Sequence, residues 1–151
     1  WVALAGATAV IGAMNADDHG VQSGSAYAFA LNWNDLESGL AGAAGVPSLL
    51  GAGSIAPGQR LWLSLSNAPP VSPTMIVIGA SALYAPFQGG VMVPATDRIV
   101  MSITGTDGEL ELEGPWPKSW PSDVDQFFQA WSVDPTGPQG YAASNAVSIS
   151  P

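Results

Sequence analysis

The chain contains no cysteine. A disulfide framework, a thiolate zinc site and a redox pair of thiols are therefore all excluded. The length of 151 residues is sufficient to bury a sizeable core without such cross-links. We expect one domain of ordinary size, or one domain with a small appendage, whose stability rests on packing.

Basic residues are also scarce. Three of them, Arg60, Arg98 and Lys118, stand against twelve carboxylates and give a formal net charge of -9. Binding to nucleic acid depends on clustered Lys and Arg that displace counterions from phosphates. Anionic membrane surfaces attract polybasic segments for a similar reason. This composition excludes both as partners.

Long apolar runs are missing. A membrane-spanning helix needs about 18 or more consecutive apolar residues, and no such stretch occurs, so membrane insertion is not expected. The chain starts at Trp1 without Met or a basic leader, so any export signal has been removed or lies outside this sequence. Charged residues make up only 10% of the chain, whereas Gly and Pro number 18 and 13. This balance is typical of acidic, exported β-proteins, and we expect an extracellular or cell-surface location.

Short runs of apolar, aromatic and hydroxyl residues lie between regularly spaced Gly and Pro residues. This spacing predicts an all-β protein, an antiparallel β-sandwich of immunoglobulin-like or jelly-roll-like type with an N-terminal hairpin. The expected strands are Val2–Ala5, Ala7–Ala13, Ser25–Leu31, Arg60–Ser66, Thr74–Gly79, Arg98–Ile103, Glu109–Glu113, Asp125–Val133 and Ala142–Ser150.

Residue alternation predicts which faces are buried. Leucine occupies every second position of Arg60–Ser66, and glutamate occupies the alternate positions of Glu109–Glu113. A period of two sends one set to the core and the other to solvent, so the glutamates should form a wet face. Thr74–Gly79 is apolar almost throughout and should be covered on both sides. Thr106-Asp107-Gly108 is a hairpin signal between two strands.

The Gly- and Ala-rich stretch between the hairpin and the C-terminal run is the expected linker. Residues 33–45 contain the best candidate for a helical turn, with Asn34 as its cap, although three glycines weaken it. The sequence therefore predicts a hairpin over residues 1–32, a linker over 33–47 and a β-sandwich domain over 48–151.

The first 31 residues carry a recognisable pattern of strand, acidic loop and strand. It consists of Val2–Ala13, Asp17-Asp18-His19-Gly20 and Ser23–Phe29, and it resembles an FG-GAP repeat, the blade unit of integrin-type β-propellers. One such hairpin cannot close a propeller, which needs about four or more blades. The chain is therefore a fragment of a longer repeat protein, or the hairpin packs on the sandwich, or its edges pair with another chain.

The remainder, from about Gly45 to Pro151, resembles a C-terminal β-domain that follows such repeats in secreted bacterial proteins. The resemblance lies in short Gly, Pro and aromatic motifs. They are Gly51-Ala52-Gly53, Ala56-Pro57-Gly58, Leu63–Pro70, Ala85–Gly90, Phe127–Asp134 and Ala142–Ala146. This resemblance implies architecture rather than an activity.

The acidic loop is the one candidate metal site. In FG-GAP repeats of other proteins such a loop can hold calcium, which takes six to eight oxygen ligands. Asn15, Asp17 and Asp18 offer oxygens but lack a regular D-x-D-x-D spacing, so we favour a solvated turn, with calcium as the alternative. No organic cofactor is expected. His19, the single histidine, is interpreted as a surface residue.

Catalysis finds little support in the sequence. One histidine without a Gly-x-Ser-x-Gly elbow argues against a serine hydrolase, and the ligands for a zinc enzyme are missing. Glycosidase chemistry needs two carboxylates across a cleft. Carboxylates of the right type are Glu109, Glu111, Glu113, Asp123 and Asp125, and we interpret them as a solvated face and an acidic loop.

Tryptophans provide the candidate binding surface. Trp116 and Trp120 lie in a Pro-rich loop and either plug the end of the sandwich, which we favour, or stack on a sugar or a protein partner. Trp62 and Trp131, inside strands, are expected in the core, and Phe87 is expected to shape a turn.

These observations predict a non-catalytic extracellular structural or adhesion module that acts through protein surfaces. One alternative is a filament subunit in which Val2–Ala13 or Ala142–Ser150 completes a neighbour's sheet. The other alternative is a carbohydrate-binding module that uses Trp116 and Trp120. The expected partners are proteins, including copies of this chain, or glycans.

Overall fold

The computed structural model describes the backbone of strands in residues 2–5, 8–13 and 25–30, and all of residues 32–151. The chain forms two compact units, Trp1–Asn32 and Trp33–Pro151. All regular structure in the described residues is β-strand apart from one 3-10 turn, η1 at Pro138–Gly140. No helix in these residues is long and apolar enough to cross a membrane.

The first unit is a small antiparallel sheet. Its strands β1 (Val2–Ala5), β2 (Thr8–Ala13) and β3 (Ser25–Ala30) follow one another in the order β1-β2-β3. They lie where the sequence predicts strands. Asn15, Asp17, Asp18 and His19 fall outside the described residues, so the calcium prediction stays a prediction.

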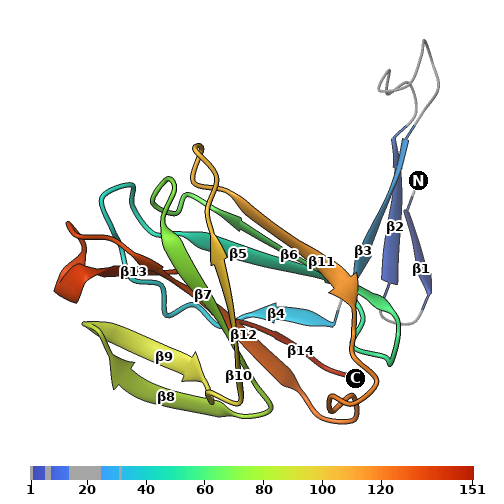
Figure 1. Ribbon diagram of the computed structural model, residues 1–151. Coiled ribbons are helices and arrows are strands. Elements are labelled where there is room, and N and C mark those ends of the chain that lie inside the picture. The colour runs from blue at the N-terminus through green and yellow to red at the C-terminus, as the bar shows by residue number, and fades with distance from the viewer. Residues whose placement is uncertain (1, 6–7, 14–24, 31) are drawn as a thin grey trace. The chain divides into compact units, whose positions relative to one another are not determined.

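The second unit is a sandwich of two antiparallel sheets with one hairpin added (Figure 1). The larger sheet has the order β10-β7-β12-β14-β4, with β13 also paired to β12, and the smaller sheet has the order β11-β6-β5. The bounds are β4 Trp33–Asp35, β5 Ser48–Gly53, β6 Arg60–Ser66, β7 Pro73–Gly79, β8 Ala82–Phe87, β9 Gly90–Pro94, β10 Arg98–Ile103, β11 Leu110–Pro115, β12 Gln126–Val133, β13 Tyr141–Ala143 and β14 Val147–Ile149. The expected all-β sandwich is confirmed.

The main core lies between these two sheets. Leu61, Leu63 and Leu65 of β6 face Ile76 and Ile78 of β7 across it, and all five are buried. The glutamates of β11 are exposed, as the alternation predicts. Burial of apolar side chains at about 25 cal/mol per Å² is the main stabilising term in such a sandwich.

A second, smaller core lies on the opposite face of the larger sheet. The hairpin of β8 and β9 covers part of this face, where Val77 and Trp131 pack with Met92. The ring of Phe87 meets that of Trp131 edge-on at 4.9 Å. Strand β7 is therefore covered on both sides over residues 76–79, as its apolar sequence predicts.

One polar side chain holds the hairpin to the sheet. Gln129 of β12 is fully buried. Its Oε1 accepts from the Val93 amide at 3.0 Å, and its Nε2 donates to the carbonyls of Val91 at 3.1 Å, Ser144 at 3.2 Å and Ser38 at 3.3 Å. Such a satisfied amide fixes β9 over β12 in one position.

The expected linker over residues 33–47 is part of the second unit. Trp33–Asp35 forms β4 and pairs with β14, so the helical turn capped by Asn34 does not form. The reason is tertiary packing, because the Trp33 ring lies against Gly51 and Phe128 of two other strands. A Cβ at Gly51 would lie 2.1 Å from that ring. The Trp33 ring can therefore occupy this position only because residue 51 is a glycine.

The expected hairpin at Thr106-Asp107-Gly108 is a turn, but it joins different sheets. Strand β10 pairs with β7, whereas β11 pairs with β6. Each strand has one apolar face turned to the common core, with Val100 on β10 and Leu112 on β11. Because the chain crosses from one sheet to the other, the inward side of β10 and the inward side of β11 both face the same core.

Candidate binding surface

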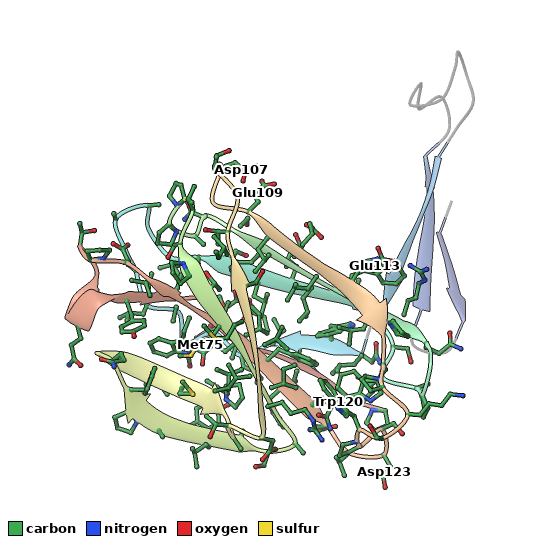
Figure 2. All side chains as sticks on the ribbon, viewed as in Figure 1. Met75, Asp107, Glu109, Glu113, Trp120 and Asp123 are labelled. Atoms are coloured by element: carbon green, nitrogen blue, oxygen red, sulfur yellow. The ribbon has the colours of Figure 1, made fainter. Side chains whose placement is uncertain are left out.

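The carboxylates singled out in the sequence are distributed over both ends of the sandwich. Asp107 and Glu109 lie at one end of the sandwich and Asp123 at the other (Figure 2). Glu113 pairs with Arg60, and Glu111 accepts from the Ser64 hydroxyl at 2.5 Å. Glycoside hydrolysis needs two carboxyl groups within about 5–9.5 Å of each other across a cleft. The described residues also contain no group of three or more His, Cys, Asp and Glu side chains that could hold a metal ion.

Asp134 is a carboxylate buried within the second unit, and its role is structural. It is 3% exposed and accepts from the Ala43 amide at 2.7 Å and from the Thr136 hydroxyl at 2.8 Å. The Ala43 hydrogen bond, helped by those from Thr136 and Gly137, lowers the pKa of Asp134 against the opposing effect of burial. These bonds tie residue 43 to the end of β12.

Trp116 and Trp120 close one end of the sandwich. Trp116 is 3% exposed and its Nε1 donates to the Pro121 carbonyl at 3.1 Å. Trp120 is half-buried and meets Trp116 edge-on at 5.0 Å. The Arg98 guanidinium lies 4.5 Å from the Trp120 ring centre, in the manner of a cation–π contact.

These contacts bear on the predicted tryptophan site. Because Trp116 is buried, the pair does not present two open indole faces to a partner. Both rings line an apolar pocket of about 260 Å³ between the sheets, together with Val100, Leu112 and Phe128. Trp131 is buried as expected, but Trp62 is 39% exposed. The core prediction for Trp62 is wrong because the leucines on either side of it occupy the inward positions of β6.

A row of apolar side chains faces outward on β10. Ile99, Met101 and Ile103 are 51%, 67% and 62% exposed; we call these three the outer face of β10. They lie opposite Val77, Met75 and Pro73 of β7 on the side of the sheet that faces away from the main core. The sequence predicts this strand, and the structure turns its more apolar set of residues to solvent, while the face with Arg98, Val100 and Ser102 is half-buried.

The hairpin of β8 and β9 extends this apolar surface. Between it and the sheet lies a pocket of about 230 Å³ lined only by apolar side chains and Thr96. Met75, labelled in Figure 2, Leu83 and Ile99 line it, and Leu83 is 57% exposed. Contiguous exposed apolar residues are uncommon on monomeric proteins and mark sites of interaction.

Comparison with known protein families gives a match at the start of the chain. Residues 1–29 match the model of the FG-GAP repeat family. The FG-GAP match lies within the first unit and agrees with the resemblance seen in the sequence. No match supports the second resemblance, over about residues 45–151. No curated protein and no solved structure matches the chain.

Proposed function

We propose that this chain is a non-catalytic structural or adhesion module of the extracellular or cell-surface space, and that it acts through protein contacts. The outer face of β10 carries the proposal, because Ile99, Met101 and Ile103 are each more than half exposed on a strand whose other residues are half-buried. Exposed aliphatic side chains in a row cost solvation free energy unless a partner covers them.

Two further observations support this function. The FG-GAP repeat matched by residues 1–29 belongs to a family of adhesion-type modules found in extracellular and surface proteins. Of the carboxylates on β11, Glu113 pairs with Arg60 and Glu111 accepts from the Ser64 hydroxyl, so both are engaged by neighbouring side chains.

The test is display of the chain on the surface of a bacterium that does not adhere. Displaying cells should attach to a protein-coated surface or to other cells more than cells without the chain. A variant with Ile99→Ser, Met101→Ser and Ile103→Ser should lower this attachment several-fold, since the three side chains are exposed and their replacement leaves the core intact.

A matched control replaces exposed apolar residues elsewhere. Leu50 and Val71 are 66% and 62% exposed and lie outside the outer face of β10, so Leu50→Ser with Val71→Ser should leave attachment unchanged. Equal attachment of all three proteins would contradict the proposed surface. Turnover of a glycan or ester by the purified chain would contradict the non-catalytic role.

A further inference from the structure

Over residues 99–103, strand β10 has an edge that nothing else in the second unit protects. It lies at the end of the larger sheet and pairs only with β7. Residues 99–103 carry no charge and no proline, and no side chain in the described part of the chain is seen to hydrogen-bond their backbone. Edges of this kind are templates for pairing with another strand, and proteins normally block them.

Two other edge strands of the second unit, β5 and β11, are blocked. On β5 the Asn145 amide accepts from the Leu49 N–H at 2.7 Å and donates to the Leu49 carbonyl at 3.1 Å, which occupies the edge. Strand β11 carries Glu111 and Glu113 and ends at Pro115.

The short and irregular strands have their own protection. Strand β4 has 3 residues and ends at Asp35. Strand β8 contains Pro86 and an irregular register between residues 82 and 85. Charge, proline, short length and bulges are the usual protective devices. Strand β10 has one of them, the charge of Arg98 at its first position, and none within residues 99–103.

We infer that β10 is a self-association edge, on which β10 of a second copy pairs antiparallel about a two-fold axis. The inference rests on the proposed function, since it names the partner of the same surface. A two-fold axis perpendicular to the sheet places the outer face of both copies on the same side of the joined sheet. Outward residues of one β10 therefore lie opposite outward residues of the other. The joined sheets would then carry two rows of the outer face side by side.

Only one register suits this pairing. With Met101 opposite Met101 of the second copy, Ile99 lies opposite Ile103 and Val100 opposite Ser102. Moving the register by two residues in one direction sets Asp97 against Ile103, and in the other direction it sets Asp97 against Asp107. Apolar cross-strand pairs are favourable and like charges directly opposite are not, so the Met101 register is preferred.

Charge makes the association depend on salt. Each copy has a formal net charge of -9, so two copies repel at long range, while the paired segment itself carries no charge over residues 99–103. Added salt screens the long-range repulsion within about 10 Å at 0.1 M. The dimer should therefore become tighter as the salt concentration rises.

The decisive experiment uses one engineered thiol. The natural chain has no cysteine, so Met101→Cys supplies the only one. Opposite residues of an antiparallel pair have Cα atoms about 4.5–5.5 Å apart, within the range that a disulfide spans. Mild oxidation should convert most of this variant to a covalent dimer.

Leu50→Cys is the matched control, because Leu50 is 66% exposed and Met101 67% exposed, each on an edge strand. This control should remain largely monomeric. Cross-linking of Leu50→Cys to the same extent would show random collision and overturn the inference. Failure of Met101→Cys to cross-link at any salt concentration would also overturn it.

A second measurement needs no cross-link. Analytical ultracentrifugation of the unmodified chain should show a dimer that Met101→Lys dissociates, because two ammonium groups would lie opposite each other, while Leu50→Lys has no effect. A wild-type monomer at every concentration would overturn self-association. Attachment of displaying cells would then still support the proposed adhesion function, whereas a dimer without attachment would support self-association alone.

Discussion

At the scale of single residues, Asp134 shows how a buried carboxylate can serve the fold. Its oxygens accept from the amides of Ala43 and Thr136 and from the Thr136 hydroxyl, and the Gly137 amide adds to the effect. All of these bonds favour the ionised form, which is why its pKa is lowered although the side chain is buried.

A pH dependence of stability follows from this shift. The folded-state pKa lies below the unfolded value of about 3.9, so the stabilisation is present above that value and is lost as the pH falls through the folded-state pKa. Asp134→Asn should lower the free energy of unfolding at neutral pH by about 1–3 kcal/mol. Urea unfolding of both proteins at neutral pH and below about pH 3 should show the difference shrink in acid. A difference that is constant across pH would contradict the role of the charge.

Residue-level sequence patterns predicted burial well where they alternate. Leu61, Leu63 and Leu65 are buried, and the glutamates of β11 are exposed. The tryptophans show the limit of reasoning from residue type. Trp62 is exposed because it occupies an outward position of β6. Trp116, in a loop, is buried, and its indole N–H donates to the Pro121 carbonyl.

At the scale of elements, the hairpin of β8 and β9 depends on one side chain of β12. Gln129→Met keeps the volume but leaves the Val93 amide and three carbonyls without their partner. Each buried polar group left unpaired costs about 1–3 kcal/mol. The variant should lose about 3 kcal/mol or more in stability, and its β9 amides should exchange with solvent faster than those of β6.

Gln126→Met is the control for this effect. Gln126 is equally buried and lies on the same strand, but its Oε1 has no partner and its Nε2 donates only to the Val124 carbonyl at 3.4 Å. This change should cost much less. Equal losses in the two variants, with no selective exchange in β9, would show that Gln129 does not act through the hairpin.

The elements that sequence patterns missed share a physical cause. Strands β4, β5, β8 and β9 contain Gly, Pro or too few residues to show a period of two. Tertiary contacts define them, such as Asn145 on β5 and Gln129 on β9. The outer face of β10 was missed for a different reason. Ile99, Met101 and Ile103 form the more apolar set of this strand and yet face solvent, whereas Val100 on the other face packs on the main core.

At the scale of the whole molecule, the second unit contains the hydrophobic cores that it needs to fold. Trp33–Pro151 has its own two-layer core and a second core under the hairpin. A fragment of these residues should fold alone and unfold in one cooperative transition. Calorimetry and proton NMR of the fragment would check this. A molten fragment without dispersed methyl signals would show that the first unit completes the core.

The pairing of β4 with β14 also bears on how the chain folds. The first strand of the second unit pairs with its last, Asp35 opposite Val147, and β7 pairs with β12 across about 50 residues of chain. Contacts so distant in sequence form slowly, because loop closure precedes them. The larger sheet cannot be completed until β14, which ends at Ile149, has been synthesised. Until then β4 and β12 of a nascent chain lack their partner strand, and their open edges are exposed to aggregation.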